Sequence, residues 1–215
     1  MTELYLIRHG ETEWNRSGHH QGHKDSDLTE SGVSQAEAMG KRLASEEITF
    51  DGIYTSDLGR ASHTCGLIAQ TIGQEDLVME REGLRERALG PLEGLTYEEI
   101  ENQLPDDFAA HTSGDPHYRP DGGESWADTF SRACAVVRQL CEDHPDQRIM
   151  IVSHGGVLGM VLRDALGLTL LPPRRFALPN AALNIFDYRD RQLELRCWGD
   201  TSHIKDVTIL DEMMK

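Results

Sequence analysis

Two histidines follow short apolar runs in an arrangement that suits phosphate chemistry. His9 lies in IRHG (7–10) and His154 lies in VSHG (152–155). The glycine after each histidine lets backbone N–H groups approach a ligand. The helix expected after His154 directs its positive N-terminal end to the same place. Imidazole, guanidinium (Arg8) and exposed amides together favour a phosphate site.

A second cation and a carboxyl group extend this candidate set. Arg60 ends the segment TSDLGR (55–60), on the first turn of an expected helix. A cation there opposes the helix dipole, and this local cost favours an anion-binding role. Glu86 in LRER (84–87) has two interpretations: a solvated loop charge, or the proton donor that phosphoryl transfer to or from an alkoxide requires.

The elements that must position these side chains follow from hydrophobic patterning. Short continuous apolar runs predict buried strands, and apolar residues at helical spacing predict amphipathic helices. The strands are expected over 4–7, 53–55, 77–79 and 149–152, with a hairpin over 184–188 and 193–198. The helices are expected over 29–46, 58–72 and 125–142, and after His154.

Strands that alternate with helices predict an α/β fold, a three-layer α/β/α sandwich with a mostly parallel central sheet and an antiparallel edge strand. Right-handed crossovers place the carboxyl ends of the parallel strands along one edge, where such folds bind ligands. The chain shows no repeat or linker, so residues 1–215 are expected to form a single domain.

The middle of the chain is less regular, and residues of about 90–125 are expected to form an inserted lid. A capping box beginning at Thr96 predicts a short helix. Residues 103–125, with several prolines and glycines, are predicted to be a long loop, and loops of this length are usually functional. Four side chains of this loop are candidates for contact with the leaving group: His111, His117, Tyr118 and Arg119.

Composition excludes several classes of partner. The chain has 21 Lys and Arg against 37 Asp and Glu, a formal net charge of −16, which disfavours nucleic acid and anionic membranes. No run approaches the ~18 apolar residues of a membrane span, and the N-terminus does not resemble a signal peptide. We therefore expect a cytoplasmic protein. Four cysteines without a CxxC pair are expected to be reduced thiols: Cys65, Cys134, Cys141 and Cys197.

The ordered motifs of the chain resemble those of the histidine phosphatase superfamily, which includes the cofactor-dependent phosphoglycerate mutases. The N-terminal half contains LIRHGETEWN (6–15), QG (21–22), DLTESG (27–32), YTSDLGR (54–60) and LRE (84–86). The C-terminal half contains GES (123–125), VSHGG (152–156) and GDTSHI (199–204). This similarity covers nearly the whole chain.

The resemblance implies a role for each matching residue. His9 is the expected nucleophile that becomes phosphohistidine, and Glu86 the expected proton donor. The phosphoryl oxygens are expected to contact Arg8, Arg60 and His154. Further substrate-binding positions implied in this way are Asn15, Gln21, Gly22 and Gly155. Two arginines supply the positive charge, so no metal or other cofactor is expected.

The sequence favours a phosphatase over a mutase. Residues 86–90 read ERALG where the phosphoglycerate mutases resemble one another in ERHYG, and the expected lid carries more acidic than basic residues. We expect a metal-independent phosphomonoesterase for small phosphorylated metabolites, as a monomer or homodimer. The alternatives are a cofactor-dependent phosphoglycerate mutase and a non-catalytic phosphate-binding or sensor protein.

Three secondary features have a structural and a functional interpretation. His19, His20 and His23, with Asp25 and Asp27, have spacings compatible with a metal site, but solvated loop histidines are the favoured interpretation. The three tryptophans Trp14, Trp126 and Trp198 are expected to be packing residues. Arg174 and Arg175 are expected to lie in a solvated turn rather than a second anion site.

Overall fold

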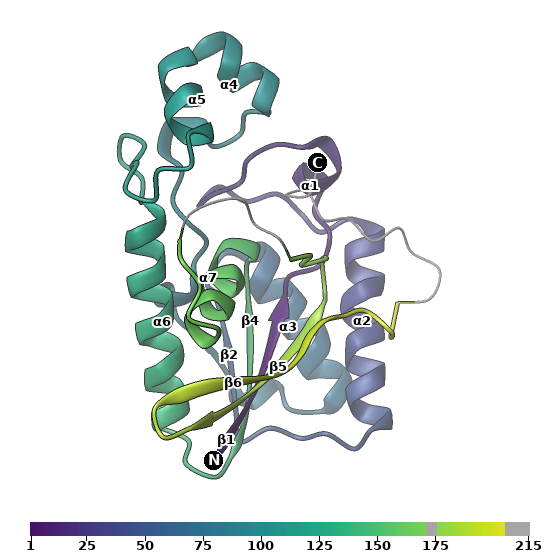
Figure 1. Ribbon diagram of the computed structural model, residues 1–215. Helices are drawn as coiled ribbons and strands as arrows, with labels where there is room; N and C mark the ends of the chain where they lie inside the picture. Colours follow the sequence, from purple (N-terminus) through teal and green to yellow (C-terminus); the bar gives the residue numbers. More distant parts are fainter. Residues whose placement is uncertain (171–175, 205–215) are drawn as a thin grey trace.

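The chain folds around a six-stranded sheet with the strand order β3-β2-β4-β1-β5-β6 (Figure 1). A computed structural model describes residues 1–170 and 176–204. Strands β3, β2, β4 and β1 are parallel, and β5 and β6 complete the sheet as an antiparallel hairpin beside β1. The predicted α/β class, with a mostly parallel sheet and an antiparallel edge, is therefore confirmed.

The strands occupy the positions that apolar patterning predicts, with wider bounds except for β3, which is shifted by one residue. They are β1 (Thr2–Arg8), β2 (Gly52–Thr55), β3 (Val78–Glu80), β4 (Arg148–Ser153), β5 (Leu183–Arg189) and β6 (Gln192–Asp200). The helices are α1 (Glu13–Ser17), α2 (Glu30–Ser45), α3 (Gly59–Ile72), α4 (Tyr97–Gln103), α5 (Pro105–Thr112), α6 (Trp126–Glu142) and α7 (Gly155–Ala165). Short 3₁₀ turns cover Glu75–Leu77, Glu82–Leu84 and Gly90–Leu92.

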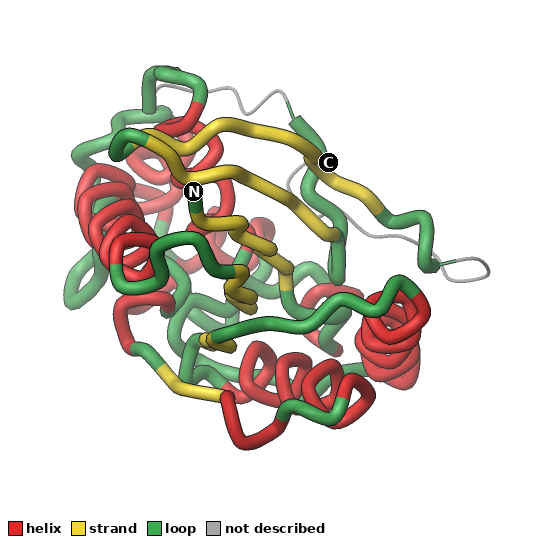
Figure 2. The backbone as a smooth tube through the Cα atoms, turned by 90° about the horizontal axis from the view of Figure 1, so that it is seen from below, coloured by secondary structure: helices red, strands yellow, loops and turns green. Residues whose placement is uncertain are grey.

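Two hydrophobic cores lie on opposite faces of the sheet. In β1, Leu4 and Leu6 belong to the core under α6 and α7, whereas Tyr5 and Ile7 belong to the core under α2 and α3. Because successive side chains of a strand point to opposite faces, a strand covered on both faces must be apolar throughout. Figure 2 shows the strands as a twisted layer with helices on both sides.

Residues 90–125 lie beyond the carboxyl ends of the parallel strands, where α4 and α5 form a small helical pair (Figure 1). A separate apolar cluster stabilises this segment, formed by Leu89, Leu92 and Ile100 with partly buried neighbours. The prediction of a loop over 103–125 is wrong in part, because residues 105–112 form α5. Pro105 occupies the first turn of α5, a position that proline favours because the N–H it lacks has no helical partner there.

Three further expectations concern the rest of the molecule. Cys65, Cys134, Cys141 and Cys197 are all free, as predicted. Within residues 1–170 and 176–204, no helix has both the length and the apolar character needed to cross a bilayer. Arg174 and Arg175, considered above as a turn or anion site, lie outside the described residues.

Candidate active site

The sheet order brings the four candidate segments to one edge. His9 follows β1, His154 follows β4, Arg60 is the second residue of the helix after β2, and Glu86 follows β3. Because β3, β2, β4 and β1 are consecutive parallel neighbours, their carboxyl ends lie side by side. His9 and Glu86, 77 positions apart in the sequence, therefore reach one site.

His9 is held in the tautomer that a nucleophile needs. Its Nδ1 lies 2.8 Å from the carbonyl oxygen of Gly10, and because a carbonyl only accepts, Nδ1 carries the proton. Nε2 therefore keeps its lone pair. Burial, together with the charges of Arg60 and Arg8, holds the pKa of His9 well below its ordinary value. The ring is thus neutral near neutral pH.

His154 lies beside His9, with ring centroids 5.3 Å apart. Its side chain has no exposed surface, and neither ring nitrogen has a hydrogen-bond partner in the described part of the chain. Burial, followed by the charges of Arg60 and neighbouring groups, lowers its pKa well below the ordinary value. Buried polar atoms without partners carry a free-energy cost, which marks a place where a ligand can supply the missing bond.

Arg60 is fixed by the loop that carries Gly22. Its side chain is 1% exposed. Nη1 donates to Asp25 Oδ1 at 2.8 Å and to the Lys24 carbonyl at 2.9 Å, and Nη2 donates to the Gly22 carbonyl at 2.8 Å. Asp25 also accepts from the backbone N–H of Gly59, so this carboxylate offsets the cation at the helix start and holds it in place.

Arg8 lies at the carboxyl end of β1 and is 5% exposed. Nη1 donates to the Leu178 carbonyl at 2.6 Å. A Cβ atom on Gly155 would lie 3.4 Å from Arg8 Nε, an ordinary van der Waals contact, so the guanidinium lies against the start of α7. Gly155 thus supports Arg8 by packing, and it is the next residue, Gly156, that borders the cavity.

Glu86 is oriented by two backbone N–H groups. Oε2 accepts from Gly156 at 2.9 Å, and Oε1 accepts from Arg87 at 2.8 Å. A Cβ atom on Gly156 would lie only 2.2 Å from Glu86 Oε1, so a side chain at this position would displace the carboxyl group. The VSHGG motif therefore contributes to the site twice, through His154 beside His9 and through Gly156, which donates to Glu86.

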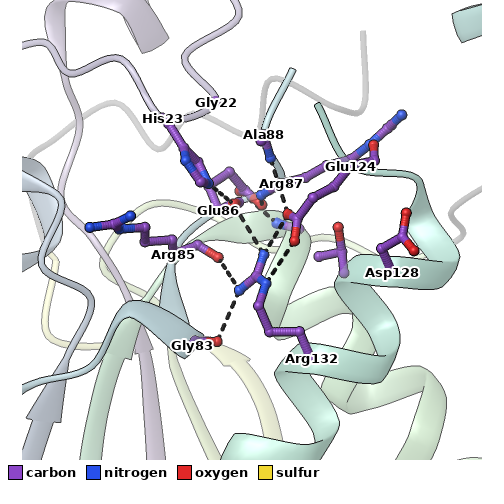
Figure 3. Close-up of polar contacts among 12 residues, drawn as sticks. Gly22, His23, Gly83, Arg85, Glu86, Arg87, Ala88, Glu124, Asp128 and Arg132 are labelled. Atoms are coloured by element: carbon purple, nitrogen blue, oxygen red, sulfur yellow. Dashed lines mark hydrogen bonds and ion pairs between the residues drawn. The ribbon is translucent and has the colours of Figure 1, made fainter. Parts of the chain in front are cut away.

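A partly buried ion pair supports the backbone around Glu86 (Figure 3). Arg132 of α6 donates from Nη1 to the carbonyls of Gly83 and Arg85, both at 2.9 Å, and from Nη2 to the Glu86 carbonyl at 3.3 Å. Its partner is Glu124, 2.7 Å away. Only the GES motif at 123–125 hinted at this support, and nothing in the sequence singled out Arg132.

These side chains border one cavity with a volume of about 290 Å³. Seven residues expected from the sequence line it: Arg8, His9, Asn15, Gln21, Gly22, Arg60 and Glu86. His154 is not one of the lining residues, and it lies beside His9. The cavity thus joins the proposed nucleophile, both arginines and the proposed proton donor.

The other wall of the cavity contains residues that sequence reasoning did not assign to it. Among them are Arg87, Leu89 and Tyr97. Trp126 also lines the cavity, so its interpretation as a packing residue is wrong; its ring covers the Arg87 guanidinium, 4.6 Å from centroid to Cζ. Of the four candidates in the expected loop, only His111 is part of the lining.

Asn180 is a supporting residue that the sequence did not reveal. Its Nδ2 lies 3.2 Å from both the His9 carbonyl and Asn15 Oδ1. Asn15 Oδ1 also accepts from the Thr12 N–H in the capping box of α1. The carbonyl end of Asn15 is therefore occupied, and its amide nitrogen is the end that remains for a ligand.

The histidines that follow α1, His19, His20 and His23, each contact a different polar group. His19 Nδ1 lies 2.8 Å from Ser17 Oγ, His20 Nδ1 lies 3.2 Å from the Leu95 carbonyl, and His23 Nε2 lies 2.9 Å from the Glu86 carbonyl. In the described ranges, no group of three or more His, Cys, Asp or Glu residues is arranged to hold a metal ion. The metal-site interpretation of this loop has no support there.

Comparison with known proteins identifies relatives over the whole chain. A metal-independent phosphoserine phosphatase of Arabidopsis thaliana is 36% identical over 211 residues, covering 98% of this chain and 86% of the relative. The probable phosphoglycerate mutase GpmB of Salmonella choleraesuis is 35% identical over 220 residues, covering all of both chains.

Solved structures and a family model agree with these relatives. A phosphoserine phosphatase variant of Entamoeba histolytica, in complex with phosphoserine, superposes with a TM-score of 0.82 and 30% identity, covering 95% of this chain and 100% of the other. The family model of the histidine phosphatase superfamily (branch 1) matches residues 4–201. With the expected motif residues at one sheet edge, this chain belongs to the histidine phosphatase superfamily.

Proposed function

We propose that this protein is a metal-independent phosphomonoesterase that hydrolyses small phosphorylated metabolites through a phosphohistidine on His9. One observation carries the proposal: a neutral His9 with Nε2 unprotonated faces the same cavity as Arg8, Arg60 and Glu86. Nucleophile, cations and proton donor are the parts that phosphoryl transfer requires.

In the first step, His9 Nε2 forms a bond to phosphorus while the bond from phosphorus to the ester oxygen breaks. Glu86 gives its proton to that oxygen, and the alcohol leaves. In the second step, the Glu86 carboxylate takes a proton from water, whose oxygen attacks phosphorus and breaks the bond to Nε2. Arg8 and Arg60 offset the negative charge on the equatorial oxygens in both steps.

The size of the cavity supports the substrate class. A volume of about 290 Å³ suits a small molecule. The relative named as a phosphoserine phosphatase supports the same class. We further propose that residues of about 90–125 are the lid that selects the leaving group, since Tyr97 and His111 of this segment line the cavity.

The first test is hydrolysis of p-nitrophenyl phosphate in the presence of EDTA. We expect phosphate release by the native protein and none by His9→Asn, with His63→Asn as control because His63 is exposed on α3. Brief reaction with radiolabelled substrate should label the native protein with an acid-labile, alkali-stable phosphoryl group. Equal turnover by His9→Asn, or activity that EDTA abolishes, would overturn the proposal.

A mutase is the second candidate, because one relative is named a probable phosphoglycerate mutase. The same preparation should be given 3-phosphoglycerate with 2,3-bisphosphoglycerate. Isomerisation with negligible phosphate release would establish the mutase. Binding of phosphate esters without either reaction would identify the non-catalytic alternative.

A further inference from the structure

Glu93 is a carboxylate outside the cavity lining that accepts three hydrogen bonds from backbone N–H groups. Oε1 accepts from His23 at 2.9 Å and from Leu89 at 2.8 Å, and Oε2 accepts from Lys24 at 3.2 Å. The bond from Leu89 closes a local turn, four positions back along the chain. The bonds from His23 and Lys24 cross from a segment about 70 positions away. One side chain therefore joins two segments that meet through the fold.

The first of these segments holds the cation Arg60. Arg60 Nη2 donates to the Gly22 carbonyl at 2.8 Å, and Nη1 donates to the Lys24 carbonyl at 2.9 Å. The Gly22 carbonyl and the His23 N–H belong to one peptide unit, which is planar, so the two groups point in opposite directions. The N–H of this unit donates to Glu93 while its carbonyl accepts from Arg60. Glu93 therefore fixes the orientation of an acceptor that holds Arg60.

The second segment carries the proposed proton donor Glu86. His23 Nε2 lies 2.9 Å from the Glu86 carbonyl, so the residue whose N–H binds Glu93 also contacts the backbone of the proton donor (Figure 3). Leu89, the other donor to Oε1, follows Glu86 by three positions. The carboxylate thus acts on Arg60 through one peptide unit and on the Glu86 segment through two contacts.

Gly22 permits the close approach of the Glu93 carboxylate. Its φ is +55°, and a Cβ atom there would lie 2.2 Å from Glu93 Oε1. Backbone bonds hold the same two segments together beside it, because Gly94 donates to the His20 carbonyl at 2.8 Å and His20 donates to the Leu95 carbonyl at 2.9 Å. Loss of the carboxylate should therefore leave the segments paired while the Gly22–His23 peptide unit becomes free to rotate.

We propose that Glu93 is a positioning residue that fixes Arg60 relative to Glu86, so that a phosphoryl group held by the arginine lies within reach of the proton donor. This inference rests on the proposed phosphatase activity and adds a residue to its machinery. Glu93 itself is not among the residues that line the cavity. It acts through backbone groups, and small errors in the placement of reacting groups are costly in rate.

Binding of inorganic phosphate, measured by calorimetry, tests the arginine side of the proposal. Glu93→Ala should raise the Kd of phosphate roughly 10-fold, as expected when a hydrogen bond to a charged group is weakened. Glu93→Gln keeps one acceptor oxygen for His23 and should raise the Kd less. Glu98→Ala is the matched control, because it removes an exposed carboxylate from the same segment. A loss of folded protein changes the stoichiometry of the titration and leaves the Kd unchanged.

The dependence of rate on the leaving group tests the proton donor side. Glu93→Ala should lower kcat/KM for an alkyl phosphate at least about 10-fold more than kcat/KM for p-nitrophenyl phosphate, because only the alkoxide needs the proton of Glu86. In the Glu86→Gln background, Glu93→Ala should leave this ratio unchanged, since the proton that Glu93 helps to place is gone. A ratio change that persists in that background would overturn the proposal.

The two readouts separate positioning from a purely structural role. A Glu93→Ala protein with an unchanged phosphate Kd or an unchanged ratio would overturn the proposal, whatever the change in its free energy of unfolding. Failure of the proposed function gives a different result, because the native protein then hydrolyses no phosphomonoester. In that case the phosphate titration still decides whether Glu93 acts on Arg60.

Discussion

At His9, one hydrogen bond and burial determine the protonation state that nucleophilic attack requires. The bond to the Gly10 carbonyl places the proton on Nδ1, and burial beside two arginines keeps the ring neutral. Glu86 is oriented in a similar way, by backbone N–H groups rather than by other side chains. Backbone contacts are rigid, so both groups are preorganised before a substrate binds.

Replacing Glu86 with glutamine separates its proposed role as an acid from a role in binding. Glu86→Gln should slow hydrolysis of an alkyl phosphate by roughly 10²- to 10⁴-fold, because an alkoxide leaves poorly without a proton. Hydrolysis of p-nitrophenyl phosphate should fall much less, since p-nitrophenolate leaves without protonation. The comparison uses kcat/KM for both esters, because this quantity reports the steps up to release of the alcohol and not the later step in which Glu86 takes a proton from water. An equal decrease for the two esters would remove the proton donor role from Glu86.

At the scale of elements, the start of α7 connects the two halves of the site. His154 is its N-cap, Gly155 lies against Arg8, and Gly156 donates to Glu86. Two consecutive glycines at a helix start disfavour the helix, since glycine costs about 1 kcal/mol relative to alanine within one. At Gly156 the absence of a side chain is instead required by Glu86, because a Cβ atom there would lie 2.2 Å from Oε1.

Two glycine-to-alanine substitutions distinguish helix stability from site geometry. Gly156→Ala should reduce kcat/KM at least about 10-fold, because the new Cβ must displace Glu86 Oε1, the end of a flexible side chain that can move at little cost in stability. Gly66→Ala in α3 meets no atom within 4 Å and should increase the free energy of unfolding by about 1 kcal/mol with unchanged activity. Full activity in Gly156→Ala would show that Glu86 tolerates the displacement.

At the scale of the whole molecule, a strongly acidic chain encloses a cationic site. The formal net charge is −16, yet the cavity contains Arg8, Arg60 and Arg87. The surrounding negative charge disfavours polyanions, while the buried arginines attract a small anion that fits the cavity. Protonated histidines would add positive charge beside these arginines. The arrangement therefore also requires that His9 and His154 stay neutral.

Stability should therefore decrease in mildly acidic solution. His9 and His154 are buried with pKa values well below the ordinary value of about 6.5, so below that pH the unfolded chain binds protons that the folded chain excludes. Each contributes a loss of about 1.4 kcal/mol per pH unit as the pH falls through this window. Urea unfolding at pH 7.5, 6.5 and 5.5 measures the effect, and His154→Gln should show a smaller decrease. A free energy of unfolding that is constant over this range would contradict the argument.

The sequence by itself determined the fold class and the family, and it indicated candidate residues for the chemistry. Continuous apolar runs in β1 and β4 indicate strands buried on both faces, because local patterning reports burial directly. His9, Arg8, Arg60 and Glu86 could be identified because each lies in a short motif next to a strand. Apolar runs and short motifs consist of residues that are adjacent in the chain, so the sequence alone is enough to identify them.

Tertiary structure alone decided which distant side chains complete the site. Arg132 of α6 donates to the Glu86 carbonyl, and Asn180 contacts the His9 carbonyl from 171 positions away in the sequence. The Trp126 ring covers the Arg87 guanidinium. Helix α5 was obscured by Pro105, which breaks a helix interior but favours a helix start. Such contacts depend on how the crossovers place α6, the 90–125 segment and the segment that precedes β5 around one edge, and no local spacing encodes that placement.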